Sequence, residues 1–434
     1  MSSHYEISRE AGALRKNKQF AEALELFKQL FEEYKDECNE FDWWGYAQCL
    51  LKLDHYHESL KVSEEGSHKY PDSEYIRNIY HWSLYHVVIK PEPVNDRQEF
   101  FNAVDEITLN SDPANKYSPF VRTIFTAIDV LELNYNENAS GILNLISKLQ
   151  PELLDQESFT FTAANGKQVQ TAPDYEKYHA ILVRALFENG RYDECIAAAD
   201  KALTLFDRFH HGNDVWIRRM KALSLYKKGL VDESLAEYQW ILSRKKDWFL
   251  KKEMAEILCE KGEYDKALVV ALDASDDPGK DQMKVNLFML VANIFKTKGL
   301  MREAAVHARL VNAVRQSQGW SADIEAENIL LEYKQADELP AELNKLQQMA
   351  EIIWEEYQPA PERLTGEIAR MLPHGNAGFI KTADNNSYYF KIRDVAERNL
   401  LPVVGMKVSF IKSESFDPVH NQPSVIAAEI RRVV

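Results

Sequence analysis

The side chains best suited to metal chemistry are two pairs of histidines. His55 and His57 flank Tyr56, and His210 and His211 are adjacent. A zinc site needs three or four converging His, Cys or carboxylate ligands, and neither pair has a third ligand in evident partnership. The repeat pattern described below also places the first pair around a surface turn. We therefore predict no metal and no cofactor.

Short motifs that accompany catalysis are missing from the sequence. It contains no glycine-rich phosphate loop, no G-x-S-x-G turn and no HExxH helix. The cysteines Cys38, Cys49, Cys195 and Cys259 are scattered without CxxC spacing. Such cysteines favour buried free thiols in a reducing compartment. We expect a protein that is not an enzyme.

Charge is unevenly distributed along the 434 residues. The chain has 52 Lys and Arg against 68 Asp and Glu, a net charge of −16, which opposes non-specific binding of nucleic acid. From Leu364 to Val434, however, nine basic residues outnumber seven acidic ones, so nucleic acid would meet this segment first. No apolar run reaches membrane-spanning length, and the N-terminus has no signal-peptide pattern. We expect a soluble, cytoplasmic protein with no membrane partner.

One pattern is repeated four times between Tyr178 and Val311. It starts at Gly190, Gly229, Gly262 and Gly299, which are 39, 33 and 37 residues apart. An apolar helical stretch precedes each glycine, and a small residue follows five positions later. Glycine ends the first helix, and the small residue lets a second helix approach the first closely. The pattern predicts four helix-turn-helix hairpins.

These hairpins resemble the tetratricopeptide repeat (TPR), a helix pair of about 34 residues. Small residues occupy the places that this family requires, and these are Ala222, Ser234, Ala255, Ala267, Ala274, Ala292 and Ala304, with Val311 larger than usual. The resemblance implies a mostly α fold, in which stacked helix pairs form a superhelix and bury their apolar sides against one another.

Helical repeats are also predicted in the rest of the chain, up to a change of hydrophobic period near its C-terminal end. We predict four regions, which are TPR-like repeats at 1–71, degenerate helical repeats at 72–173 with a β-hairpin near 157–171, TPR-like repeats and capping helices at 174–357, and a separate domain at 364–434. In the first repeat of the chain Lys18 replaces the turn glycine. The hairpin is predicted from alternating residues around Asn165–Gly166. Pro359 and Pro361 stiffen the linker to the last domain.

The hydrophobic period changes to two from Leu364 onward. Five short strands are predicted around Gly366–Ile368, Gly378–Lys381, Tyr388–Ile392, Met406–Phe410 and Ser424–Ile430. Five strands in about 70 residues favour a small closed barrel of the OB type. The motifs Gly366-Glu-Ile368, Asn376-Ala-Gly-Phe-Ile380, Tyr388-Tyr-Phe-Lys-Ile392 and Gly405-Met-Lys-Val-Ser-Phe410 stand in the order and spacing of the cold-shock domain, which they resemble.

That resemblance implies a face that binds single-stranded nucleic acid. Phe379 and Tyr389 keep two of the family's base-stacking places, and such stacking is worth roughly 1–3 kcal/mol per base. Arg370 stands at the family's tryptophan place and Lys391 at its histidine place. The implied binding residues are Arg370, Phe379, Lys381, Tyr389, Lys391 and Arg393. The alternative is a barrel kept as a protein-docking or structural module, with Phe379 partly buried against a neighbour.

Stacked helix pairs also form a concave groove, lined by the first helix of each pair and suited to an extended or helical peptide. The candidate partner-binding residues on this face are Trp44, Gln48, Arg184, Arg219, Tyr226, Lys252 and Asn293. The alternative is a solvated face whose charges help solubility. The Lys–Asn clamp that some TPR proteins use for a C-terminal carboxylate is not reproduced, which disfavours a receptor for chaperone tails.

These observations predict a non-enzymatic scaffold or adaptor. Its TPR groove would dock a protein partner, while its barrel would contact RNA or single-stranded DNA as part of a nucleic-acid-handling complex. The alternative is a purely protein-binding TPR adaptor whose barrel no longer binds nucleic acid.

Overall fold

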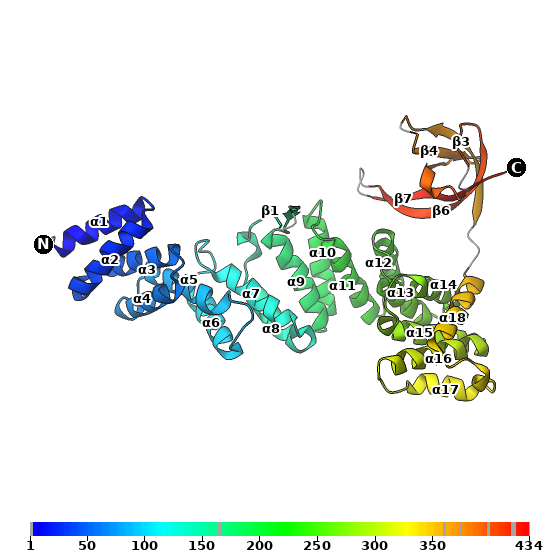
Figure 1. The fold of residues 1–434 in the computed structure, drawn as a ribbon, viewed down its shortest axis with the longest axis horizontal. Helices are drawn as coiled ribbons and strands as arrows, with labels where there is room; N and C mark the ends of the chain where they lie inside the picture. The colour runs from blue at the N-terminus through cyan, green and yellow to red at the C-terminus, as the bar shows by residue number, and fades with distance from the viewer. Residues whose placement is uncertain are drawn as a thin grey trace. The chain divides into compact units, whose positions relative to one another are not determined.

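The computed structural model describes residues 3–163, 166–358, 362–373, 375–396, 400–417 and 422–433. Within these residues the chain forms eighteen α-helices followed by a small β-barrel (Figure 1). Two compact units are formed by Met1–His211 and Gly212–Val434. No helix in the described part of the chain is both long and apolar enough to cross a membrane.

The first unit is built from successive helix pairs. In chain order they are α1 (His4–Lys16) with α2 (Phe20–Tyr34), α3 (Glu40–Lys52) with α4 (Tyr56–Lys69), α5 (Glu74–Leu84) with α6 (Arg97–Asn110), α7 (Phe120–Glu132) with α8 (Tyr135–Ser147), and α9 (Asp174–Glu188) with α10 (Tyr192–Leu205). Short helical turns η1 (Lys35–Glu37) and η3 (Pro151–Leu153) join some of them. The π-helical turn η2 (Tyr85–Ile89) extends α5 and packs against α6.

Helix pairs also open the second unit. They are α11 (Asn213–Lys227) with α12 (Val231–Arg244), α13 (Trp248–Glu260) with α14 (Tyr264–Asp276), and α15 (Asp281–Thr297) with α16 (Met301–Ser317). Helix α17 (Ile324–Glu332), the turn η4 (Ala336–Glu338) and helix α18 (Leu343–Tyr357) follow, and both helices pack on α16. Helix α18 packs on α14 and α16. Its Trp354 Nε1 donates a hydrogen bond of 2.8 Å to Nε2 of the buried His307 on α16.

The turns inside the pairs follow the predicted pattern. Gly190, Gly229, Gly262 and Gly299 have φ angles of 70°, 78°, 79° and 77°, a conformation that glycine adopts without steric cost. The small residues that follow, Cys195, Ser234, Ala267 and Ala304, are fully buried between the two helices. Lys18 and Asp54 adopt φ angles of 63° and 62° at the corresponding turns of α1–α2 and α3–α4, so these turns keep their shape without glycine.

A two-stranded hairpin interrupts the helices between α8 and α9. Strand β1 (Thr160–Thr162) pairs antiparallel with β2 (Gln168–Gln170), and Phe161 lies opposite Val169. Gly166 of the predicted turn has a φ angle of 78°. Asn165 lies outside the described residues, and so do Pro359 and Pro361 of the predicted linker.

The barrel is formed by β3 (Arg363–Met371), β4 (Ala377–Thr382), β5 (Ser387–Lys391), β6 (Lys407–Asp417) and β7 (Gln422–Arg432), with the turn η5 (Ile392–Asp394) after β5. It closes in the order β3-β4-β5-β7-β6, and the β5–β7 pair is parallel while the others are antiparallel. Its interior contains Ile368, Ile380, Phe390, Val408, Phe410, Ala427 and Ile430, all fully buried. The predicted mostly α repeat fold, followed by a five-stranded barrel, is thus confirmed.

Candidate binding surfaces

One outer face of the barrel gathers aromatic and basic side chains from β3, β4 and β5. In the strand register Arg370 lies opposite Phe379, and Phe379 lies opposite Tyr389. Residues directly opposite in antiparallel strands share a face of the sheet, so these three side chains form one row. The Arg370 guanidinium carbon lies 4.8 Å from the Phe379 ring centroid, and the Phe379 and Tyr389 centroids are 5.6 Å apart, edge to face.

A β-bulge in β3 places Arg370 on this face. Ile368 pairs with Ile380 inside the barrel, so strict alternation would also turn Arg370 inward. The register instead shifts by one residue between Ile368 and Arg370. Gly378 permits the close approach of β4, because a Cβ there would lie 2.6 Å from the Arg370 carbonyl oxygen. The bulge and the glycine together bring Arg370 beside Phe379.

Lysines lie on both sides of this row. Lys381 is two residues from Phe379, and Lys391 is two residues from Tyr389, so both share the outer face. Arg393 lies beyond the strand in η5 and is 77% exposed, with its Nε 3.8 Å from Asp394 Oδ1. The structure therefore brings five of the six predicted residues onto one face, with Arg393 near its edge. We call Arg370, Phe379, Lys381, Tyr389 and Lys391 the barrel face.

The predicted groove residues all lie on the first helices of their pairs. Trp44 and Gln48 are on α3 and Arg184 is on α9, whereas Arg219 and Tyr226 are on α11, Lys252 is on α13 and Asn293 is on α15. Seven residues spread over five helices form several separate contacts. Those contacts differ between the two units.

In the second unit these side chains form a ladder between successive first helices. The Arg219 guanidinium on α11 binds the Glu253 carboxylate on α13 through two hydrogen bonds, with Nε 2.9 Å from Oε2. The buried Tyr238 donates to the same carboxylate over 2.8 Å. Burial, together with this neighbouring carboxylate, raises the pKa of Tyr238. Glu253 thus satisfies two side chains that are largely removed from water.

The other predicted residues of this unit also bond to acidic side chains. Tyr226 donates to Glu260 on the next first helix, and burial together with this bond raises the pKa of Tyr226 to about 12. Asn293 Nδ2 donates to Glu325 on α17 over 2.9 Å. Lys252 bonds within its own helix to Glu256 at 2.5 Å. Four candidates for partner binding are therefore engaged inside the protein.

Sequence reasoning missed the acidic half of this ladder. Glu253 follows Arg219 by 34 residues, and Glu260 follows Tyr226 by the same distance. That distance is one repeat, so it carries a side chain to the equivalent place on the next first helix. An acidic residue one repeat after a donor is the signal that would have found these pairs.

In the first unit the predicted residues have other partners. Arg184 stacks on Tyr135, with its guanidinium carbon 3.7 Å from the ring centroid, and also contacts Glu132 at 3.4 Å. Gln48 accepts a 2.6 Å hydrogen bond from Arg15, whose guanidinium carbon lies 4.0 Å from the Trp44 ring centroid. Arg15 was not among the predicted residues. Trp44 and Gln48 thus belong to one contact, which also includes a cation.

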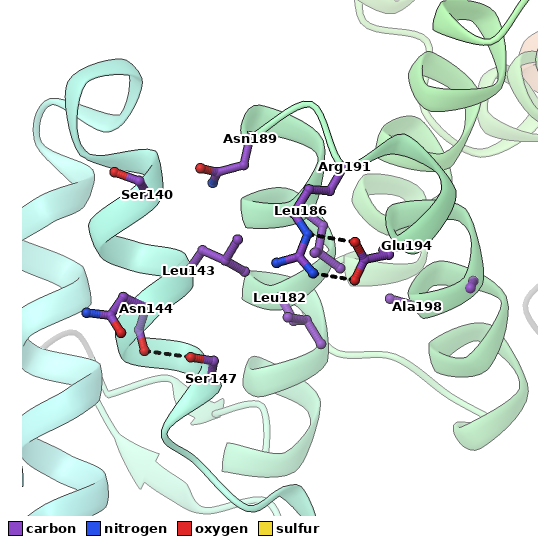
Figure 2. A pocket seen from close by; sticks show the side chains of 11 residues that line it. Ser140, Leu143, Asn144, Ser147, Leu182, Leu186, Asn189, Arg191, Glu194 and Ala198 are labelled. Carbon is purple, nitrogen blue, oxygen red and sulfur yellow. Dashed lines mark hydrogen bonds and ion pairs between the residues drawn. The ribbon is translucent and has the colours of Figure 1, made fainter.

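A further groove of about 650 Å³ lies between α8, α9 and α10 (Figure 2). Leucines from α8 and α9 form part of its lining. Its charged residues, Arg191 and Glu194, are bonded to each other, with Arg191 Nε 2.7 Å from Glu194 Oε1. Ser147 donates to the backbone oxygen of Asn144 over 2.8 Å. These polar groups of the groove are therefore already engaged with one another.

One histidine of each pair has a side-chain partner elsewhere in the protein. His55 lies 3.5 Å from the exposed Glu58, and Tyr56 stacks on His86 with ring centroids 4.3 Å apart. His210 binds the buried Glu176 through its ring Nδ1 at 2.6 Å and its backbone N–H at 2.9 Å. That contact ties the loop after α10 back to α9.

Comparisons with known proteins relate the chain to solved TPR structures. A TPR protein from Thermus thermophilus is 16% identical, and the match covers 59% of this chain and 100% of that one, with a TM-score of 0.22. A TPR protein from Parabacteroides merdae is 12% identical, with 76% and 98% of the two chains covered and a TM-score of 0.29. No family model and no curated protein matches the sequence.

Proposed function

We propose that this chain is a non-enzymatic scaffold whose repeats dock a protein partner and whose barrel binds RNA or single-stranded DNA. The observation that carries the second part is the row of Arg370, Phe379 and Tyr389 with a lysine on either side. Rings and a guanidinium supply flat surfaces for unstacked bases, and the lysines meet phosphates. A chain that joins two binding modules is suited to be an accessory subunit of a nucleic-acid-handling complex.

The order of the strands supports the same proposal. In OB barrels the binding face lies over the second and third strands. In this barrel those strands are β4 and β5, which carry Phe379, Lys381, Tyr389 and Lys391. The cold-shock resemblance of the sequence points to the same strands. Position in the barrel and side-chain chemistry therefore agree.

The second candidate function is a purely protein-binding adaptor. Phe379 and Tyr389 are half-buried, and Arg370 covers part of the Phe379 ring, so less aromatic surface remains for a base than two isolated rings would offer. In that case the barrel face would act as a protein-docking or structural surface.

Fluorescence anisotropy of the full chain with labelled oligouridine and oligothymidine, over a series of salt concentrations, separates these functions. We expect binding that weakens as salt rises, because lysine–phosphate contacts release counterions. Phe379→Ala combined with Tyr389→Ala should weaken binding by about 30-fold or more, since each stacked base is worth roughly 1–3 kcal/mol.

Phe161→Ala serves as the matched control, because it removes an exposed ring from the β1–β2 hairpin and leaves the barrel intact. It should bind both oligonucleotides as the wild type does. Absence of binding at low salt would leave the protein-binding adaptor, and equal binding by the double variant would rule out the barrel face as the nucleic-acid site.

A further inference from the structure

The starts of two first helices in the first unit expose large aromatic rings. Phe41 and Tyr75 are the second residues of α3 and α5, and they are 54% and 55% exposed. The Tyr75 ring centroid lies 5.8 Å from that of Phe41 and 5.2 Å from that of Trp44. Three rings in contact, two of them half in water, form an apolar patch of the kind that anchors partner side chains.

This patch forms one wall of a groove of about 570 Å³ lined by α1, α3 and α5. Gly12 lies on the α1 side of the groove, and a Cβ added there would meet no atom within 4 Å. The space above this glycine is therefore open, and a ligand side chain can enter it without any movement of the helices. We call the space between Gly12 and the rings of Phe41, Trp44 and Tyr75 the N-terminal groove.

Three basic side chains of α1 line the N-terminal groove. Arg9, Arg15 and Lys16 line it, and within the described residues no carboxylate lies within 4 Å of their charged groups. The Asp42 carboxylate also lines the groove, but it accepts hydrogen bonds from Ser8 Oγ at 2.5 Å and from the Asn39 backbone at 3.0 Å.

Arg15 is the most informative of these cations. It is partly buried over the Trp44 ring, and its hydrogen-bond partner is the neutral amide of Gln48. Burial lowers the pKa of its guanidinium, because the charge loses hydration. A partly buried cation without a carboxylate, in a chain of net charge −16, is positioned to meet an anion from outside.

We propose that the N-terminal groove binds an acidic peptide segment of a partner protein. An aromatic or large aliphatic side chain of the segment packs against Phe41, Trp44 and Tyr75, and flanking carboxylates bind Arg9, Arg15 and Lys16. This inference rests on the proposed docking function of the repeats, and it assigns that function to α1, α3 and α5 and to one chemical class of partner.

A peptide fits these observations better than a nucleic acid does. The rings are tilted against one another by 55° and 49°, so they form a pocket wall for one bulky group and no stack of parallel faces for successive bases. Nucleic acid also carries a charge on every phosphate. The part of such a polyanion that extends past the three basic side chains would be repelled by the net negative charge of the chain. In a short acidic peptide the negative charges lie beside the one bulky side chain that packs on the rings, so all of them are close to the basic side chains.

Selection of a random peptide library on the full chain tests the proposal. We expect enriched peptides to combine one aromatic or large aliphatic residue with flanking aspartates or glutamates, and their affinity to fall as salt rises. Gly12→Leu fills the open space with a residue that favours the helix more than glycine does, so binding should fall by about 30-fold without loss of folding. Gln48→Glu gives Arg15 a carboxylate and should weaken binding by about fivefold.

Glu332→Gln is the matched control, because it changes one carboxyl group at the first-helix contact between Lys296 and Glu332 in the second unit. It should bind the selected peptides as the wild type does. Enriched peptides without acidic residues, or with equal affinity for Gly12→Leu, would overturn the proposal while leaving a docking function elsewhere on the repeats.

Two further outcomes complete the test. If no peptide is enriched at all, the docking function of the repeats fails together with this proposal. If Gly12→Leu abolishes the binding of oligouridine while the barrel double variant does not, the groove binds nucleic acid and the peptide proposal is wrong.

Discussion

The first helices of the two units use the same position in different ways. Arg15 on α1 and Lys296 on α15 each lie three residues before the residue of positive φ that ends their hairpin turn, Lys18 and Gly299. Each side chain reaches to the next first helix. Lys296 meets the carboxylate of Glu332 at 2.7 Å, whereas Arg15 meets the amide of Gln48 at 2.6 Å.

This difference concerns which basic side chains of the first helices have a carboxylate partner. In the second unit the donors on first helices find carboxylates one repeat later, and the face contributes to holding the array together. In the first unit a neutral amide stands at the equivalent contact, so Arg15 keeps its charge available. Arg15 and Lys296 both precede a turn residue of positive φ by three positions, and the partner is a carboxylate in one unit and an amide in the other.

Loss of the Glu253 carboxylate should have the largest effect on the second unit. Glu253→Ala leaves Arg219 and the buried hydroxyl of Tyr238 without their acceptor, and removal of one member of a largely buried pair is costly. We expect the free energy of unfolding to fall by about 3 kcal/mol in urea denaturation. Glu332→Ala removes a half-exposed carboxylate and should cost less than about 0.5 kcal/mol. Equal losses in the two variants would contradict the ladder.

Acid should weaken the second unit through His307. This imidazole is fully buried, so desolvation lowers its pKa from 6.5 to about 4. Its Nε2 accepts the Trp354 N–H, and its Nδ1 lies 2.8 Å from the Glu303 carbonyl oxygen, so the folded protein needs the neutral ring. In the unfolded chain this imidazole takes up a proton near pH 6.5, whereas in the folded chain it does so only near pH 4. Stability is therefore retained above this pH and falls as the pH drops toward 4.

We expect this histidine to account for about 2 kcal/mol of lost stability between about pH 7 and about pH 5. Urea denaturation of wild type and His307→Gln across this range, followed by tryptophan fluorescence, isolates the contribution, because glutamine does not titrate. The stability difference between the two proteins should shrink as the pH falls. A difference that stays constant with pH would show that His307 does not carry this linkage.

The repeat architecture could be predicted from the sequence because particular residue types mark its turns. Gly190 and its three equivalents must adopt positive φ, and the buried small residues after them leave room for the second helix. Lys18 and Asp54 show the limit of that rule. They adopt the same turn conformation against their steric preference, because the packed helices on either side determine the backbone there.

The candidate sites were less accessible to prediction. Period-two alternation would turn Arg370 inward, and only the cold-shock resemblance placed it on the barrel face beside Phe379; its role there stays a prediction. The N-terminal groove was missed, apart from Trp44 and Gln48. A signal was present, since Tyr5, Phe41 and Tyr75 each follow the N-cap residues Ser3, Asn39 and Ser73 by two positions and are all exposed. The contact of Tyr75 with Phe41 and Trp44 across helices could not be deduced from spacing alone.

Exchanging the partners of Arg15 and Lys296, so that Arg15 meets a carboxylate and Lys296 an amide, should give the smallest change in stability. It is also the most direct test of the difference between the two units. Gln48→Glu supplies Arg15 with a carboxylate, and Glu332→Gln removes one from Lys296. Because both contacts are partly exposed, we expect the first variant to gain, and the second to lose, less than about 1 kcal/mol in urea denaturation. The gain should vanish at high salt, where screening removes the attraction between the charges.

A double-mutant cycle isolates the attraction between Arg15 and the carboxylate introduced by Gln48→Glu. Arg15→Met keeps much of the side-chain volume over Trp44 but removes the charge, so Gln48→Glu should bring no gain in that background. A gain that persists without Arg15 would mean that the glutamate acts through another group. The first unit would then resemble the second in having its cations already compensated, and the distinction between an open and a closed first-helix face would fail.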